Sequence, residues 1–368
     1  MNNPTANAQA TTVGLDVHKA SIRLAAVADG AILHEQTIPH DLAIVDTVLA
    51  RFPAARCCYE AGPTGFGLYR HLTERGIDCD VVAPGLVPSK PGDRVKTDAR
   101  DARKLALLHE NGLLTAIEVP DPELEALRDL VRAREAARID RMRDRHRLSK
   151  FCLRQSREMP GKSWGVTRRG WLAQQHFPFA TQQCAFDLYL HALDLVDRRI
   201  AALDARIQEA ADQDRFRELV GRLRCLRGVD TLTAIGLVAE VGDFSRFERA
   251  EQFMAFVGLV PAEHSSGEQR RRGSITKAGN AHVRRLLIES AWHARRRPMV
   301  SYELQRRQRD QSAATIEHAY RCQARLHKRF SRMAARGKPQ QKIVVACARE
   351  LAGFVWAIAT EQPLVTVN

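Results

Sequence analysis

The feature that most constrains the fold is the order of extended and helical patterns near the amino terminus. Apolar and polar residues alternate in the segments 13–17 and 22–26, and a third extended run covers 31–38. A period of two is typical of strands, so we predict three antiparallel strands. The elements predicted next are helix 41–51, strand 55–60, helix 67–75, strand 78–83 and helix 97–110. Strands that alternate with helices indicate an α/β layer.

The remainder of the sequence is predicted to be mostly helical. Further helices are predicted at 122–157, 183–218, 250–257 and 280–297, and two more follow before a short tail. Within 183–218, apolar residues recur in steps of three and four at Leu193, Val196, Ile200, Leu203 and Ile207. This seam is typical of a coiled coil or a helical hairpin. It can pack on its own chain or on a second copy, so a dimer is a hypothesis.

Length and charge limit the class of protein. A chain of 368 residues with 45% hydrophobic residues can bury more than one core. The net charge of +14 favours a polyanionic partner, either a nucleic acid or an acidic membrane surface. Residues 1–118 hold 12 Lys and Arg against 14 Asp and Glu, a balance of −2, so the remaining 250 residues carry +16. An acidic first part is thus joined to a basic second part.

The location of the protein and the state of its thiols can also be predicted. No stretch approaches the roughly 20 apolar residues needed to cross a bilayer. The start MNNPTANAQATT lacks the basic and apolar regions of a signal peptide, so we expect a cytoplasmic protein without a membrane partner. Eight cysteines are scattered without a CxxC pair, which argues against zinc sites and disulfides. We predict that they are reduced and mostly buried.

Acidic residues fall on elements that can converge. Asp16 lies in the first predicted strand between Leu15 and Val17, where an unpaired buried carboxylate would be costly. Glu60 ends a later strand before the turn AGPTG, and strand ends are where α/β sheets bind ligands. It can also merely cap the helix that follows.

Asp98 and Asp101 lie three residues apart in a predicted helix and therefore on one face of it. Their like charges are unfavourable side by side unless a cation sits between them. The alternative is that both are first-turn acids stabilised by the helix dipole. If all four acids converge, they can hold one or two Mg²⁺ ions, because hard cations need clusters of oxygen ligands. Such ions activate a nucleophile and neutralise charge on a transferring phosphoryl group.

Three segments carry a resemblance to a known family. GLDVHKASIRLAAV, YEAGPTGFGLYRHLTERG and KTDARDARKLALL resemble the acidic blocks of the DEDD transposases, the IS110 family of bacterial insertion sequences, which includes the Piv-type DNA invertases. The resemblance implies a RuvC-like, RNase-H-like amino-terminal domain. It also implies that the catalytic, metal-binding acids are Asp16, Glu60, Asp98 and Asp101.

A fourth segment, GLVPAEHSSGEQRRRGSITKAGNAHVRRLL, is similar to the second signature of that family. The resemblance implies that Ser266, before Gly267, attacks the scissile phosphate, with the metal of the acidic domain nearby. Ser265 is the alternative nucleophile, Ser274 is a weaker one, and His264 is a candidate base. Without the resemblance, this polar loop would be interpreted as a solvated turn, because a serine hydroxyl is a weak nucleophile until it is activated.

Cations are dense beside this serine. Residues 268–297 hold nine Lys and Arg against two acids, which favours phosphate contacts over a solvated face. Asn280 is a predicted N-cap, so the helix that follows can present its N-terminus to a phosphate. A second basic stretch, 128–158, is either a solvated helix or a face that follows phosphates. The residues predicted to bind nucleic acid are Arg270, Arg271, Arg272, Lys277, Arg284 and Arg285.

The resemblance, together with the acids and the basic second part, implies a DNA recombinase, the transposase of a bacterial insertion sequence, with a serine nucleophile and an acidic tetrad that binds Mg²⁺. The resemblance further implies a bridge RNA that pairs with donor and target DNA, and a homo-oligomer, a tetramer. Three other functions stay open on the residues alone. They are a metal-dependent junction nuclease, a DNA invertase that needs no RNA, and a non-catalytic architectural binder.

The predicted architecture has three parts. A disordered extension at 1–11 precedes a RuvC-like α/β metal-binding domain at 12–157. A long helical, coiled-coil connector follows at 158–217, and a mostly α transposase domain that contains the serine covers 218–368.

Overall fold

A computed structural model describes residues 11–88, 98–263 and 272–362 of the chain. The chain forms two compact units, Met1–Pro120 and Asp121–Asn368. The extension predicted to be disordered lies outside the described residues except for Thr11. That residue is buried, and its carbonyl accepts a hydrogen bond of 2.9 Å from the Arg56 N–H, so Thr11 belongs to the ordered fold.

Within the described part of the first unit, five strands form one mixed sheet in the order β3-β2-β1-β4-β5. The strands are β1 (Thr12–Val17), β2 (Ser21–Ala28), β3 (Ala31–Pro39), β4 (Arg56–Glu60) and β5 (Asp78–Val82). The first three pair antiparallel, and β4 and β5 extend the sheet in parallel on the other side of β1. The antiparallel start and the α/β layer predicted from the sequence are confirmed.

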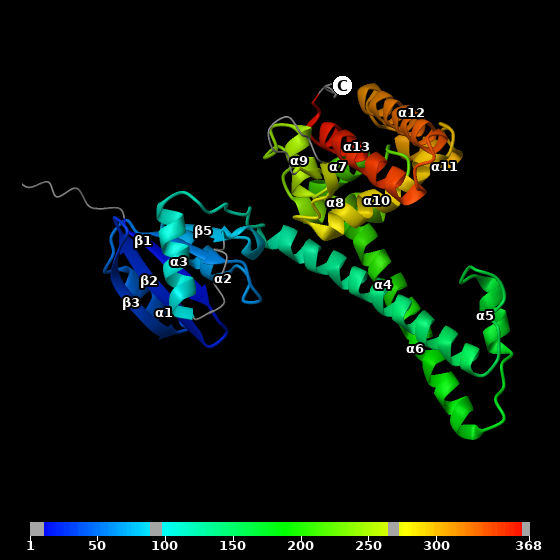
Figure 1. The fold of residues 1–368 in the computed structure, drawn as a ribbon, viewed down its shortest axis with the longest axis horizontal. Helices are drawn as coiled ribbons and strands as arrows, with labels where there is room; N and C mark the ends of the chain where they lie inside the picture. Colours follow the sequence, from blue (N-terminus) through cyan, green and yellow to red (C-terminus); the bar gives the residue numbers. More distant parts are fainter. Residues whose placement is uncertain (1–10, 89–97, 264–271, 363–368) are drawn as a thin grey trace, which may run out of the picture. The chain divides into compact units, whose positions relative to one another are not determined.

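Helices cover both faces of this sheet. They are α1 (Leu42–Leu49), α2 (Gly67–Glu74) and α3 (Asp98–Glu110), with a 3₁₀ turn, η1 (Pro84–Leu86). On one face, Val45 of α1 and Leu72 of α2 pack with Leu15 and Tyr59 in one apolar cluster. On the other face, α3 crosses β1 and β2 (Figure 1).

α3 approaches β1 closely because Gly14 has no side chain. A Cβ atom on Gly14 would lie 2.2 Å from the Ala102 carbonyl oxygen and 2.5 Å from the Ala106 backbone nitrogen. The residues beside Gly14 in register, Ala25 on β2 and Cys58 on β4, are also small. A shallow strip of small residues therefore receives the helix.

Contacts at the end of α3 give its direction. Glu110, its last residue, accepts a hydrogen bond of 3.1 Å from the Gly30 N–H, in the turn between β2 and β3. Thr12, at the start of β1, pairs with Val27 beside that turn. α3 therefore runs antiparallel to β1, and its first turn lies toward the end of β1 that holds Asp16.

The second unit is mostly helical, as predicted. Its elements are α4 (Pro122–Arg154), α5 (Val166–Ala173), α6 (Ala180–Ala211), α7 (Asp214–Leu223), α8 (Thr231–Val241), α9 (Ala250–Phe256), β6 (Pro261–Glu263), β7 (Arg272–Ile275), α10 (Ala281–Ala291), the 3₁₀ turn η2 (Trp292–Arg295), α11 (Tyr302–Gln308), α12 (Ala313–Ala335) and α13 (Gln340–Thr360). One apolar core joins α7, α8, α9, α10, α12 and α13, and it includes Leu237, Phe253, Leu287 and Leu351.

α4 and α6 form an antiparallel helical hairpin (Figure 1). Arg134 pairs with Asp204, whereas Arg141, further along α4, pairs with the earlier residue Asp197. Most of the apolar seam predicted in α6 packs within the chain, in a cluster that includes Leu148 of α4. The helical hairpin is thus found in the structure, and the seam gives no support for self-association.

Three helix predictions in this unit need correction. The helix predicted at 183–218 is two helices, because Gln213 has extended backbone angles (φ −65°, ψ 145°) between α6 and α7. The helix predicted to reach residue 157 ends at Arg154. Ser156 has a φ of 55°, which is incompatible with a right-handed helix. The helix predicted at 280–297 ends at Ala291, where the 3₁₀ turn η2 takes over.

The end of the first domain was predicted at residue 157, whereas the first compact unit ends at Pro120. The difference concerns α4, which packs on α6 and α8. For example, Arg128 donates a hydrogen bond of 2.8 Å to the Ala239 carbonyl. By its packing, α4 belongs to the second unit, and the predicted domain bounds at 157 and 217 stay predictions.

The expectation that no segment approaches bilayer length was wrong for α13. This helix of 21 residues is long and apolar enough to be a candidate span by length and composition, but 61% of its apolar window is buried inside the second unit. It packs against α9, α10 and α12. Leu351 and Val355 have at most 1% of their surface exposed, so α13 serves as the core helix of this unit.

The prediction that the cysteines are mostly buried is confirmed. All eight are free, seven are buried, and Cys184 near the start of α6 is exposed. Burial, together with the charge of Asp78, raises the pKa of the Cys57 thiol to about 12. Burial also raises the pKa of Cys225 to about 11. The buried thiols are therefore uncharged packing groups.

Gly14→Val tests the contact between α3 and β1. We expect the first unit to lose about 1–3 kcal/mol of stability, because the added carbons meet backbone atoms that cannot rotate away. Chemical unfolding of the full chain and amide hydrogen exchange in β1 and α3 measure the loss. Gly67→Ala is the control, since its Cβ would meet nothing within 4 Å. Equal effects of the two substitutions would contradict the role assigned to Gly14.

Candidate active site

Asp16 and Glu60 lie side by side at the ends of neighbouring parallel strands. β1 and β4 pair with Leu15 opposite Tyr59, so the next residues in register are Asp16 and Glu60. Residues in register point to the same face of a sheet, on strands about 4.8 Å apart. That face is the one under α3, because Gly14 lies two residues before Asp16. Both side chains are partly buried.

α3 brings further acids toward the same end of the sheet. Asp101 is partly buried and immediately precedes Ala102, which packs on Gly14. α3 begins at Asp98, but the Asp98 side chain lies outside what the structure describes. Among the described residues, no group of three or more His, Cys, Asp or Glu is placed to hold a metal ion. The described acids therefore gather at one end of the sheet without forming a closed set of ligands.

Basic groups surround Asp16. The Nε2 atom of His18 lies 3.1 Å from the Asp16 carboxylate. Arg23 is opposite Asp16 in register on β2 and pairs with Glu35 of β3 at 3.1 Å. Arg103 of α3 pairs with the same Glu35. Two guanidinium groups thus share one carboxylate, which leaves positive charge beside the acids.

The predicted nucleophile, Ser266, belongs to the segment 264–271, which lies outside the described residues together with Ser265 and His264. The strands on either side of that segment are described. Glu263, at the end of β6, pairs with Arg272, at the start of β7. The two residues that flank the serine segment are therefore neighbours on paired strands.

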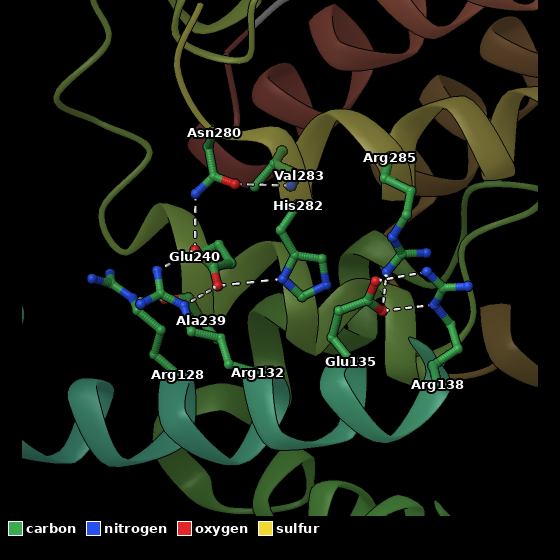
Figure 2. Close-up of polar contacts among 10 residues, drawn as sticks. All are labelled: Arg128, Arg132, Glu135, Arg138, Ala239, Glu240, Asn280, His282, Val283 and Arg285. Carbon is green, nitrogen blue, oxygen red and sulfur yellow. Dashed lines mark hydrogen bonds and ion pairs between the residues drawn. The ribbon is translucent and has the colours of Figure 1, made fainter. Parts of the chain in front are cut away.

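A buried carboxylate holds the chain that follows β7. Glu240, in the last turn of α8, has a side chain only 1% exposed. It accepts hydrogen bonds from Arg132 of α4 at 2.8 and 3.0 Å and from the Asn280 amide at 2.8 Å. Its Oε1 atom also lies 3.3 Å from His282 Nδ1. Figure 2 shows the three side chains converging on Glu240.

The same contacts fix the start of α10. The Asn280 side-chain oxygen accepts a hydrogen bond of 3.0 Å from the Val283 N–H, so the N-cap predicted from the sequence is confirmed. Its amide nitrogen is bound to Glu240 at the same time (Figure 2). Asn280 thereby links α10 and the chain after β7 to α8, and through Arg132 to α4.

Electrostatics explain why Glu240 stays charged in the interior. Burial by itself would raise its pKa, but hydrogen bonds from His282, Arg132 and Asn280 outweigh burial and hold the pKa well below its usual 4.5. The groups around it also line a pocket of about 390 Å³, formed by Arg132, Glu135, Glu240, Asn280, Ala281 and His282. The donors that line this pocket, from Arg132, Asn280 and His282, contact both oxygens of the Glu240 carboxylate.

The six residues predicted to bind nucleic acid have different outcomes. Arg270 and Arg271, and the side chain of Arg272, lie outside what the structure describes. Lys277 is exposed and has a left-handed φ of 56°. Ser274, the weaker candidate nucleophile, is exposed on β7.

The remaining two of the six have partners within the chain. Arg284 donates hydrogen bonds to the carbonyls of Val257 and Ala278 at 2.9 and 3.3 Å. Arg285 pairs with Glu135 and Glu289, both at 2.7 Å, and Figure 2 shows the pair with Glu135. A phosphate would have to compete with these contacts, so phosphate binding by Arg284 and Arg285 stays a prediction.

Sequence reasoning missed Glu240 and Arg132. A signal for Glu240 exists, because it is the single charged residue in the apolar helix TLTAIGLVAEV, and an acid in such a place is almost always paired. No such signal marks Arg132, which is one of many cations in the stretch 128–158. Its partner is distant in sequence and becomes apparent only in the folded unit.

Comparisons with known proteins agree with the two signatures in the sequence. Residues 13–156 match the profile of a transposase family of the DEDD, IS110 type, and residues 220–306 match the transposase IS116/IS110/IS902 family. A putative transposase of Sinorhizobium fredii is 44% identical over 318 residues, which are 86% of this chain and 78% of the relative. A transposase for the insertion sequence element IS1533 of Leptospira borgpetersenii is 35% identical over 336 residues, 89% of this chain and 97% of the relative. The first family match implies an RNase-H-like amino-terminal domain, in agreement with the mixed sheet of the first unit.

Glu240→Ala tests the anchor. We expect the second unit to lose about 2–4 kcal/mol, because Arg132, Asn280 and His282 lose a shared partner in a buried place. The midpoint of chemical unfolding measures this. Glu289→Ala is the control, since that carboxylate is 57% exposed and its helix pair with Arg285 contributes about 0.5 kcal/mol or less.

The difference in stability between wild type and Glu240→Ala should also depend on pH. The folded-state pKa of Glu240 lies below its usual value of 4.5. Its stabilising contribution is therefore complete above that value and is lost as the pH falls below it. The stability gap between wild type and Glu240→Ala should narrow when unfolding is measured from about pH 6 down to about pH 3. A gap that does not change with pH would show that the charge of Glu240 contributes nothing.

Proposed function

Because this chain belongs to the IS110 family of insertion-sequence transposases, enzymes that cleave and transfer DNA strands, we propose that it does so with Ser266 as nucleophile and a divalent-metal centre. The ligands we assign are Asp16, Glu60, Asp98 and Asp101. The observation that carries the proposal is the register of β1 and β4, which puts Asp16 beside Glu60 under the start of α3.

The chemistry of these side chains fits a hard cation. Carboxylate oxygens are the ligands that Mg²⁺ prefers, and two carboxylates at neighbouring strand ends repel each other unless positive charge offsets them. When bound, Mg²⁺ would activate the attacking group and neutralise charge on the phosphoryl group. Arg23 and Arg103, which share Glu35, add positive charge at the same edge and favour the approach of an anionic DNA strand.

Ser266 would supply the covalent step. Its Oγ atom forms a bond to the scissile phosphorus while the bond from phosphorus to the departing sugar oxygen breaks. The hydroxyl proton passes to a base, for which His264 is the nearest candidate in sequence, and the departing oxygen finally takes up a proton. Energy of the phosphodiester is thereby kept in the serine ester, so the strand can be joined to a new end by reversal of this step.

We also propose a guide RNA and a multimer, on the strength of the family resemblance in the two signatures. A bridge RNA that pairs with donor and target DNA would carry the choice of sequence, and the protein would then mostly bind backbone. The charge of +16 on residues 119–368 suits that role. A homo-oligomer, a dimer or a tetramer, would hold the DNA ends that are exchanged. Strand exchange that survives ribonuclease treatment would favour an RNA-independent invertase instead.

Ser266→Ala tests the nucleophile. The wild-type protein, purified with its co-expressed flanking element and supplied with Mg²⁺ and DNA that carries the element ends, should form a covalent protein–DNA adduct visible after denaturing electrophoresis. Ser266→Ala should lose that adduct, whereas Ser265→Ala should keep it. Cleavage without an adduct in any of the three proteins would exclude the serine mechanism and favour a metal-dependent nuclease.

Asp16→Asn tests the metal centre. We expect the rate of strand cleavage to fall at least about 100-fold, the scale of one lost electrostatic group in an active site, because an amide is a poorer ligand for Mg²⁺ than a carboxylate. The rate is measured as a function of Mg²⁺ concentration. Asp78→Asn is the control, since that acid is 65% exposed on β5, and its rate should stay within about twofold of wild type. Equal rates for both variants would remove Asp16 from the site.

A further inference from the structure

The second half of α4 carries a row of exposed cations. Arg143, Arg147, Lys150 and Arg154 follow one another at steps of four, three and four residues, so they lie on one face of the helix. All four side chains are exposed, whereas Leu148 faces the apolar cluster shared with α6. We call these four residues the α4 cation row.

Nearby acids do not balance the charge of the row. Residues 140–171 hold ten Lys and Arg against three acids, Asp140, Asp144 and Glu158. Arg143 pairs with Asp140 at 3.5 Å and Arg147 with Asp144 at 2.8 Å. The arginines of these helix pairs are 62 and 60% exposed and therefore weakly held. Within the described residues, neither Lys150 nor Arg154 has a carboxylate within the 4.0 Å of an ion pair. A surplus of positive charge thus stays on this face.

Further arginines converge beside the row. Burial and the charges of Arg141, Arg169 and Arg168 lower the pKa of Arg145. The Arg145 Nε atom is buried and has no hydrogen-bond partner in the described part of the chain. Asp197 of α6 pairs with Arg141 and Arg169, and Asp194 pairs with Arg169 as well, so the arginines of this cluster outnumber its carboxylates. Mutual repulsion in this cluster would be relieved by an anion.

Aromatic rings hold this end of the hairpin together. The guanidinium carbons of Arg145 and Arg168 lie 5.3 and 4.9 Å from the centre of the Trp164 ring. Arg157 lies over the Phe177 ring at 4.2 Å. Such cation–π contacts fix arginines in place, and here they attach the connection between α4 and α6 to α4. The basic surface is therefore preorganised, which lowers the entropy lost on binding.

We propose that the α4 cation row binds the phosphodiester backbone of a nucleic acid. The row spans about 16 Å of helix at 1.5 Å per residue, and one strand of a duplex carries about five phosphates over that length. The spacing of the four exposed cations is thus similar to that of the phosphates. Cations that neutralise phosphates release the counterions condensed on the strand, and this release of counterions drives binding. The choice of a nucleic acid over another polyanion rests on the proposed function, whereas the site itself rests on the contacts above.

The test is a fourfold substitution of the row, Arg143→Gln, Arg147→Gln, Lys150→Gln and Arg154→Gln, in the full-length chain. Glutamine favours helix and removes only the charge. The matched control removes four charges from exposed arginines elsewhere in the second unit. These are Arg206, Arg217, Arg306 and Arg321, which are 71, 66, 61 and 59% exposed and are also changed to Gln.

Binding is measured by fluorescence anisotropy between about 50 and 300 mM salt, in buffer without Mg²⁺ so that no strand is cut. The two probes are a DNA duplex of about 30 base pairs and an RNA hairpin of similar length. For at least one probe, the row variant should bind at least about tenfold more weakly than wild type. The slope of log affinity against log salt should also be smaller by up to about 3.6, which is 0.9 for each lost phosphate contact on duplex DNA. The control variant should change much less.

Loss with the duplex alone assigns the row to DNA, loss with the hairpin alone assigns it to RNA, and loss with both supports one shared backbone surface. Equal affinity and slope in the row variant and the control variant, on both probes, would overturn the proposal. Thermal unfolding and circular dichroism of each variant exclude a folding defect. If the fourfold variant fails to fold, Lys150→Gln with Arg154→Gln is used, and its slope should fall by up to about 1.8. Because no strand is cut, the result does not depend on whether Ser266 is the nucleophile.

Discussion

The contact between α3 and Gly14 is the constraint on which the first unit depends. The helix can lie directly on β1 because no side chain separates them, with the Ala102 carbonyl where a Cβ atom would otherwise be. The close approach makes the position of the acids on α3 depend on the position of those on the strands. Asp16 and Glu60 are fixed by strand register, and the start of α3 is fixed by the packing of Ala102 and Ala106 on the same strand. The proposed metal site, assembled from elements far apart in sequence, would thus gain precision from one missing side chain.

In the second unit, a buried charge fixes the arrangement of the helices, whereas in the first unit a missing side chain does so. Glu240 is held by donors from α4 and from the start of α10, and a buried carboxylate with so many donors permits few other arrangements of the three helices. The segment 264–271 precedes the anchored chain by only a few residues, and the pairing of Glu263 with Arg272 joins its two ends. The residues that stabilise this unit around Glu240 are therefore different from Ser266 and its neighbours, to which the proposed chemistry is assigned.

Much of the fold could be predicted from the sequence, because its patterns are local. The alternation in residues 12–38 and the strands at 55–60 and 78–83 agree with the sheet, and the four acids could be singled out from motif and position. The break at Gln213 could not be predicted, since nothing in its neighbourhood forbids a helix and tertiary packing decides there. The strands β6 and β7 are too short for a period of two to be detected. Glu240 and Arg132 lie 108 residues apart, and no local pattern indicates that pairing.

The distribution of the cysteines has a practical consequence. Seven thiols are enclosed, and Cys184 alone is exposed. It lies near the start of α6, two residues after Gln182, whose amide donates a hydrogen bond of 3.0 Å to Gln155, directly after α4. The unaltered chain therefore offers one accessible attachment point for a maleimide dye or a spin label, at the same end of the hairpin as the α4 cation row. Oxidants that react with accessible thiols would modify the folded protein at this position first.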